Sequence, residues 1–138
     1  MALLWLAPQA YADDSRSNAD ALFKRGRQAA TAGDYVAACA DFIESQRLDP
    51  SVGTLVNLGD CETHLGHLMQ ARNYFKAALA QLGEGDPRYP VARDAVAQLE
   101  ADIPTLTIHA RTTDLIVQRD GVRVPDEELG TAVPLDRH

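Results

Sequence analysis

The chain has 138 residues, a formal net charge of −7 and 46% hydrophobic residues. This length accommodates one or two small domains, and the apolar fraction is sufficient for a packed core. The acidic balance argues against nucleic acid or an anionic membrane as the main partner, because both carry negative charge. No stretch of the sequence is long and apolar enough to form a transmembrane helix.

The N-terminal segment differs in composition from the rest of the chain. Residues 1–12 are mostly apolar and are followed by two aspartates, Asp13 and Asp14. The end of the segment, Ala10-Tyr11-Ala12, has the small-x-small pattern of a secretory cleavage site, which predicts cleavage between Ala12 and Asp13. We interpret residues 1–12 as the remnant of a signal peptide whose basic start is missing. The alternative is a short apolar arm packed on the domain.

The sequence contains an internal repeat with an offset of 33 residues. The coinciding pairs are Leu22 and Leu55, Gly26 and Gly59, Gly33 and Gly66, Ala38 and Ala71, and Phe42 and Phe75. Small and aromatic residues thus recur in one order at one offset, and a repeat of this length is typical of stacked helical hairpins.

Each repeated unit is expected to form two helices. In the first unit, apolar residues at helical spacing lie on both sides of Gly33-Asp34, and aspartate is a favoured N-cap. Gly66 separates two apolar stripes in the second unit in the same way. Asp49-Pro50 ends the first unit, and Ser51 is expected to cap the helix that follows. The small residues of the repeat allow paired helices to approach closely.

A fifth helix is expected after the loop at residues 83–87. The loop is rich in glycine and ends in proline, and an apolar stripe at helical spacing then runs from Ala92 to Ile103. Pro90 suits a first helical turn, and Pro104 ends the helix. We expect this helix to cover the open end of the second unit, since a stack of repeats needs a cap.

Beyond Pro104 the apolar period changes to alternation. Leu106, Ile108 and Ala110 alternate with polar residues, and Asp120-Gly121 is a hairpin signal. Three or four short strands cannot bury two sheet faces here, because a β-sandwich takes roughly 100 residues. We therefore expect residues 104–138 to be the start of a small β-sandwich-like domain that is incomplete at His138.

The helical part resembles a pair of tetratricopeptide repeats (TPRs) over residues 19–85. The residues that carry the resemblance are Gly26, Gly33, Tyr35, Ala38, Phe42 and Pro50 in the first unit, and Asn57, Leu58, Gly59, Gly66, Ala71, Phe75 and Ala78 in the second. The sequence departs from the pattern at Ser45, where the family has alanine, and at Glu62, where it has tyrosine. The join between units is also one residue short. The resemblance implies a mainly α domain at 17–103, with two TPR-like hairpins and a capping helix.

The C-terminal part is similar to the first half of PEGA, a small β-domain of cell envelopes. The similarity lies in the Leu-x-Ile start at Leu106 and in the hairpin sequence that runs from Val117 to Val122. Together the two resemblances imply a protein of the bacterial cell envelope, periplasmic or otherwise exported.

The two cysteines are placed to meet. Cys39 lies eleven residues before Pro50 and Cys61 eleven residues after it, and Pro50 marks the turn between two antiparallel helices. Residues equidistant from such a turn lie side by side, so we predict a disulfide in an oxidising compartment. The alternative is a pair of buried free thiols, if the chain is cytosolic.

The sequence shows no signature of catalysis. It lacks a Gly-rich phosphate loop, a Gly-x-Ser-x-Gly elbow and a CxxC pair, so we expect no enzyme, no catalytic residue and no cofactor. His64 and His67 lie near Asp60 and Glu62, and two imidazoles with a carboxylate could hold zinc. However, Gly66 separates the two histidines and no HExxH is present, so a solvated helix end is preferred and no metal is expected.

The TPR resemblance implies that the first helix of each unit lines a concave groove. The groove residues would be Phe23, Arg27, Asn57, Asp60 and His64. Asn57 matches an asparagine that hydrogen-bonds the backbone of an extended peptide in related repeats; alternatively, it caps or bridges neighbouring helices. Phe23 and Arg27 replace the lysine and asparagine of the family's carboxylate clamp, so a receptor for chaperone tails is not supported.

These features predict a non-catalytic protein–protein interaction or scaffold module of the cell envelope. A protein or peptide partner would occupy the groove, and the β-domain would meet another protein or a surface glycan. The alternative function is that of an accessory or sensor subunit in a larger envelope enzyme or transport complex.

Overall fold

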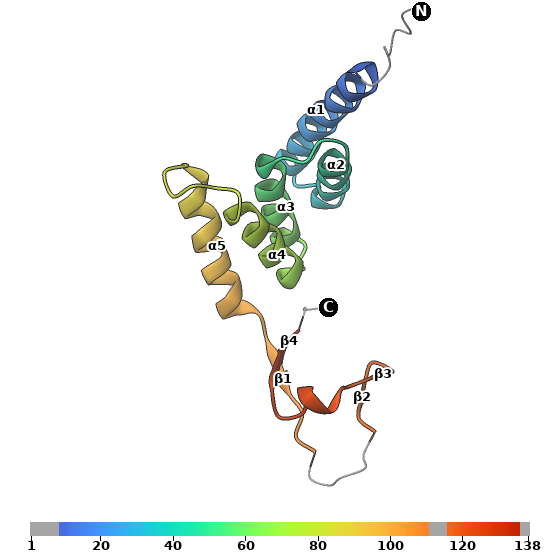
Figure 1. Cartoon of the computed structure of the whole chain (residues 1–138), viewed down its shortest axis with the longest axis vertical. Coiled ribbons are helices and arrows are strands. Elements are labelled where there is room, and N and C mark those ends of the chain that lie inside the picture. Colours follow the sequence, from blue (N-terminus) through green and yellow to red (C-terminus); the bar gives the residue numbers. More distant parts are fainter. Residues whose placement is uncertain (1–8, 111–115, 136–138) are drawn as a thin grey trace, which may run out of the picture.

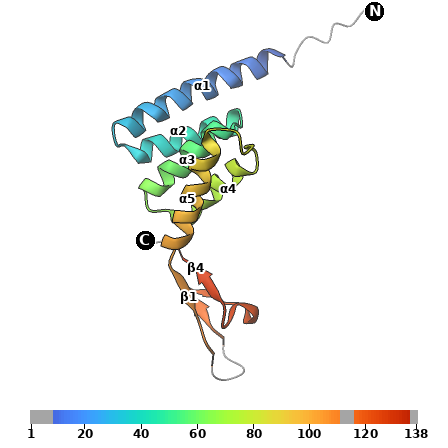
Figure 2. The same ribbon diagram turned by 90° about the vertical axis from the view of Figure 1, so that its left-hand side faces the viewer.

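The computed structural model describes residues 9–110 and 116–135, with side chains from Asp14 onward. Within these ranges the chain is mainly helical, as predicted, and its short strands follow the last helix. Figures 1 and 2 show the helices stacked in chain order, with the strands extending beyond the end of the stack. The helices are α1 (Gln9–Thr31), α2 (Tyr35–Leu48), α3 (Val52–His64), α4 (Leu68–Leu79) and α5 (Arg88–Asp102).

The predicted N-caps of α2 and α3 are both present. The Asp34 carboxylate accepts a hydrogen bond from the backbone N–H of Ala37 at 3.0 Å. The Ser51 hydroxyl accepts one from the N–H of Thr54 at 3.1 Å. Each bond satisfies one of the amide groups that a helix start leaves without an intrahelical partner.

The 33-residue repeat corresponds to a repeated close contact between helices. A Cβ atom on Gly26 in α1 would lie 2.8 Å from the ring of Phe42 in α2. A Cβ atom on Gly59 in α3 would lie 2.7 Å from the ring of Phe75 in α4. In each hairpin a glycine on the first helix therefore leaves room for a phenylalanine on the second, which explains why both residue types recur.

The turns inside the two hairpins are also equivalent. Gly33 and Gly66 have φ angles of +80° and +79°, in the left-handed region that favours glycine. The residue after each glycine donates its N–H to the carbonyl five positions earlier. This is the bond of a Schellman motif, in which a left-handed glycine ends a helix.

Two hydrophobic clusters lie along the stack. The first joins the two hairpins and consists of Ala38, Cys39, Phe42, Leu58 and Cys61. The second joins α3, α4 and α5 and consists of Leu55, Ala71, Phe75, Ala78, Leu82, Ala92, Val96 and Leu99. The apolar stripe of α5 thus covers the second hairpin, as the sequence predicts for a capping helix.

Helix boundaries differ from the expected ones at two places. α1 begins at Gln9, directly after Pro8, instead of near residue 17, because neither proline nor glycine interrupts residues 9–16. The predicted cleavage bond after Ala12 therefore lies inside α1, and residues 1–8 are outside the described part. α4 ends at Leu79, whereas the loop was expected to begin at residue 83; Leu82, which lies between the two, is still buried.

The described C-terminal residues form two small antiparallel sheets. β2 (Gln118–Arg119) and β3 (Val122–Arg123) make the predicted hairpin, in which Asp120 and Gly121 have φ angles of 53° and 79°. Positive φ at both central residues is the type I′ geometry that suits twisted strands.

The second sheet pairs β1 (Thr105–Thr107) with β4 (Ala132–Pro134), and the 3₁₀-helix η1 (Asp126–Glu128) precedes β4. The expected alternation through Ala110 is not one strand, since β1 ends at Thr107. Residues 111–115, within the expected β-domain, lie outside the described residues. Among the described residues after Ile103, Val124 alone is buried, so these sheets have little core.

Candidate functional site

The residues expected in a groove lie on the first helices of the two hairpins. Phe23 and Arg27 are on α1, and Asn57, Asp60 and His64 are on α3. Their spacing of three or four residues places each set on one side of its helix. Arg27, Asp60 and His64 are exposed, whereas Phe23 and Asn57 are half-buried. Three of the five side chains are thus directly available to a partner.

Phe23 and Asn57 also make contacts within the protein. The ring of Phe23 lies 5.7 Å from the ring of Phe42, centroid to centroid, and helps to hold α1 on α2. The Nδ2 of Asn57 donates a hydrogen bond to the carbonyl oxygen of Gly53 at 2.8 Å. This bond lies within α3, whereas the sequence-based alternative placed Asn57 at a cap or a bridge between helices.

The two histidines considered as zinc ligands have different partners. The His64 ring stacks on Tyr35, with centroids 3.9 Å apart and planes 6° from parallel, and its Nε2 lies 3.8 Å from an Asp60 oxygen. The Nδ1 of His67 lies 2.7 Å from a carboxylate oxygen of the buried Glu62. Within the part of the chain that the structure describes, no three His, Cys, Asp or Glu side chains gather to hold a metal ion.

Cys39 and Cys61 meet as the sequence predicts. Their Cα atoms, on α2 and α3, are 5.7 Å apart and their sulfurs are bonded. Both residues are buried in the first hydrophobic cluster. The link therefore fastens the first hairpin to the second at the centre of their contact.

An ion pair between the exposed Arg25 on α1 and the buried Asp41 on α2 was not predicted from the sequence. The Asp41 carboxylate is 9% exposed and accepts a hydrogen bond from the Nε of Arg25 at 2.6 Å, with a second from its Nη2. The hydrogen bonds from this guanidinium hold the pKa of Asp41 below its ordinary value. The only signal in the sequence is an aspartate beside Phe42 in an otherwise apolar stripe.

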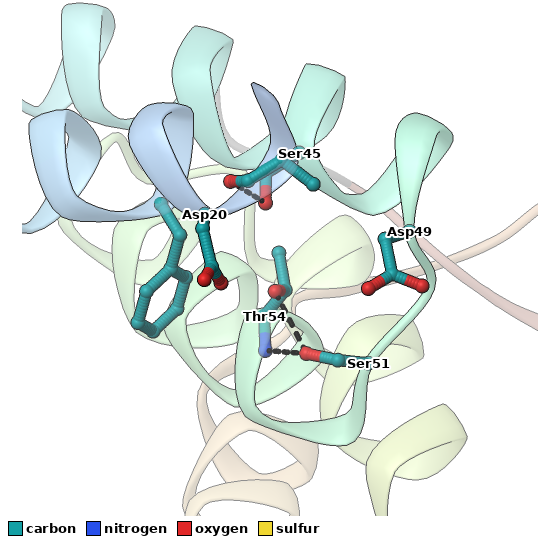
Figure 3. A pocket seen from close by; sticks show the side chains of 7 residues that line it. Asp20, Ser45, Asp49, Ser51 and Thr54 are labelled. Carbon is teal, nitrogen blue, oxygen red and sulfur yellow. Dashed lines mark hydrogen bonds between the residues drawn. The ribbon is translucent and has the colours of Figure 1, made fainter. Parts of the chain in front are cut away.

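A cavity of 150 Å³ lies where α1 meets the end of α2 and the start of α3. Its lining residues are Ala19, Asp20, Phe23, Ser45, Asp49, Ser51 and Thr54. Figure 3 shows Asp20 and Asp49 on opposite sides of this space, with the hydroxyl-bearing side chains between them. Of these residues, the sequence predicted only Phe23 as part of a binding surface; Asp49 and Ser51 were assigned to helix ends and Ser45 to a departure from the repeat pattern.

The hydroxyl groups of the cavity are ordered by hydrogen bonds. The Ser45 hydroxyl, nearly fully buried, donates to the carbonyl oxygen of Ala19 at 2.9 Å. The hydroxyls of Ser51 and Thr54 lie 2.9 Å apart. Ser45 occupies the position at which the TPR pattern that the sequence resembles has alanine, and this departure was the one sequence signal that could have indicated a polar interior here.

Comparison with known proteins assigns no family or function to this chain, so its function is argued from the side chains and contacts described above. Neither a protein-family model nor a curated protein matches the sequence. In the described ranges, no helix has the length and apolar character needed to cross a membrane.

Proposed function

We propose that this protein is a non-catalytic interaction module of the bacterial cell envelope. In this proposal its two hairpins are TPR-like repeats that hold a protein or peptide partner on the α1–α3 face, the surface that carries Arg27, Asn57, Asp60 and His64. The observation that carries the proposal is that exposed polar side chains line the first helices of two consecutive, equivalent hairpins. Stacked helical repeats act through such extended surfaces.

The chemistry of the α1–α3 face supports a peptide as its occupant. An open depression on α1 is lined by Lys24, Arg27, Gln28 and Thr31, which offers donors for carboxylates and backbone carbonyls. Asp60 on α3 adds an acceptor for backbone N–H groups. A surface with both donors and acceptors matches the paired polar groups of an extended chain.

The bond between Cys39 and Cys61 supports export. Disulfides persist in oxidising compartments such as the bacterial periplasm and are rare in the cytosol. We therefore keep the interpretation that Asp13 is the first mature residue. Sequencing the N-terminus of the protein secreted from its complete reading frame tests this; an intact chain recovered from the cytosol contradicts it.

For residues 104–138 we propose the PEGA-like role of a second contact, with another protein or a surface glycan. Strands β1 and β4 extend past the end of the helical stack (Figure 2), so a ligand there would leave the α1–α3 face free.

The experiment on the face compares two double variants in capture from envelope extract. Arg27→Ala with Asn57→Ala removes two side chains of the face. Asn73→Ala with Arg93→Ala is the matched control, because it removes the same residue types from exposed positions on α4 and α5. We expect the first variant to lose most of the captured partner and the control to retain it, with melting temperatures close to that of the unmodified protein.

Two results would contradict the proposal. One is equal capture by both variants, which would place binding elsewhere. The other is a melting temperature that falls in parallel with capture in the first variant, which would make Arg27 and Asn57 structural residues.

A further inference from the structure

The stack has two junctions that can be compared. At the first, α1 and the end of α2 meet the start of α3; at the second, α3 and the end of α4 meet α5. Two positions that are polar at the first junction are apolar at the second. At the offset of 33 residues, Ser45 corresponds to Ala78 and Asp49 to Leu82. The two positions share one backbone bond, because Asp49 donates its N–H to the Ser45 carbonyl and Leu82 to the Ala78 carbonyl, each at 3.0 Å, although α2 continues to Leu48 and α4 ends at Leu79. Ala78 and Leu82 are buried in the second cluster. The fold therefore accepts apolar residues at these positions, and the polar ones at the first junction have another reason.

The α1 wall of the cavity shows the same contrast. Asp20 corresponds to Gly53 on α3, and Phe23 corresponds to Val56, which packs against the second cluster. The first junction thus has a carboxylate from each of two segments and an aromatic ring at positions where the second junction has Gly53, Leu82 and Val56. No ion-pair partner of Asp20 occurs within the described part of the chain.

The lining of the cavity is suited to a cation that carries hydrogen-bond donors. The carboxylates of Asp20 and Asp49 face a common space (Figure 3), and their mutual repulsion is relieved when a positive charge lies between them. The Phe23 ring adds a face that attracts cations and covers an alkyl chain. The hydroxyls of Ser51 and Thr54 supply further acceptors.

The cavity has room for the end of a side chain. Its volume of 150 Å³ exceeds the ~10–15 Å³ that one water needs, so it can receive an ammonium group together with part of its alkyl chain. We propose that this cavity binds a primary ammonium group, that of a lysine side chain on the partner protein. The inference rests on the proposed function for the source of the lysine, whereas the ammonium site itself is independent of it.

One carboxylate of the cavity, that of Asp49, already has a positively charged neighbour within the protein, Arg16. The Nε of Arg16 is 3.6 Å from an Asp49 oxygen, and the two side chains are 72% and 44% exposed. An exposed pair at this distance is weak, so a ligand can displace it. Removing Arg16 should therefore strengthen ammonium binding.

The test uses the full chain and follows backbone amide signals by NMR at neutral pH. The probes are n-butylammonium chloride, a short blocked peptide with one lysine, the same peptide with N-acetyl-lysine, and calcium chloride. We expect saturable shifts at Asp20 and Thr54 with the lysine peptide and with butylammonium, and none with the acetylated peptide. A peptide that binds more tightly than butylammonium identifies a protein lysine as the ligand; tighter binding of the free amine contradicts that source.

Variants separate the cavity from the rest of the surface. Asp20→Asn should weaken binding about five- to tenfold, as expected for loss of a partly desolvated charge-assisted bond. Asp94→Asn on α5, 70% exposed and outside both the cavity and the α1–α3 face, is the matched control and should change nothing. Ser45→Ala with Asp49→Leu copies the second junction, so it should fold and lose binding altogether. Arg16→Ala should tighten binding about twofold.

Several results would overturn the inference. These are the absence of saturable shifts with either ammonium probe, equal affinity in the Asp20 and Asp94 variants, and binding of calcium without binding of ammonium. If butylammonium binds but capture does not depend on Arg27 and Asn57, the proposed function fails and the cavity assignment stands. If capture depends on them and ammonium does not bind, the reverse holds.

Discussion

Reduction of the bond between Cys39 and Cys61 should destabilise the helical stack strongly. The bonded residues are separated by 22 positions. For a loop of this length, the chain-entropy relation gives about 3.4 kcal/mol at 25 °C, through constraint of the unfolded chain. The unfolding free energy of small domains is about 5–15 kcal/mol, so this is a large fraction of the total. The repeat core is small, since two hairpins and one capping helix share two clusters.

The assay is urea unfolding monitored by circular dichroism, with and without a phosphine reductant. For an m-value of about 2 kcal/mol/M, reduction should lower the midpoint by roughly 1.7 M. Cys39→Ala with Cys61→Ala should show no response to reductant, which controls for effects of the reagent. Its midpoint should lie below that of the reduced protein, because truncating two buried side chains also leaves a cavity. Equal midpoints for oxidised and reduced protein would refute the reasoning.

Two further predictions concern single contacts in the stack. Gly59→Ala should destabilise the protein by about 1–3 kcal/mol, since the new Cβ would lie 2.7 Å from the Phe75 ring, whereas Gly85→Ala, with open space around it, should leave the urea midpoint unchanged. For Asp41, the lowered pKa means that its pairing with Arg25 stabilises the fold above the ordinary value of 3.8, and that this stabilisation is lost as the pH falls below it. When melting temperature is plotted against pH, Asp41→Asn should reduce the fall at acidic pH. An unchanged plot would contradict the role given to the Asp41–Arg25 pair.

The helical fold could be predicted because its signals are local. Gly33 and Gly66 adopt the left-handed conformation that ends the first helix of each hairpin. Asp34 and Ser51 cap the helices that follow them, each through a hydrogen bond to an N–H three residues later. The cysteine pairing followed from the same logic, since a tight turn between two helices fixes which residues are opposite each other.

The unpredicted features depend on contacts between distant positions. Arg25 and Asp41 are 16 residues apart on two different helices, and only the rotation of α1 against α2 brings them together. The pairing of β1 with β4 skips the intervening hairpin, which no alternation of residues indicates. The cavity is lined by residues of α1, α2 and α3, so its prediction would need the relative positions of all three helices. Ser45 and Asp49 are recognised as unusual only when the two junctions are compared in the structure.

Site-specific photocrosslinking in intact cells tests the central claim most directly. A photoreactive residue at Arg27 or at Asp60 would place the crosslinker on the α1–α3 face, and one at Asn73 would place it on an exposed position of α4. If the face holds a partner, the first two positions yield one common adduct in the envelope fraction and Asn73 does not. No adduct from either face position, or the same adducts from all three, would contradict the assignment of this surface as the binding site.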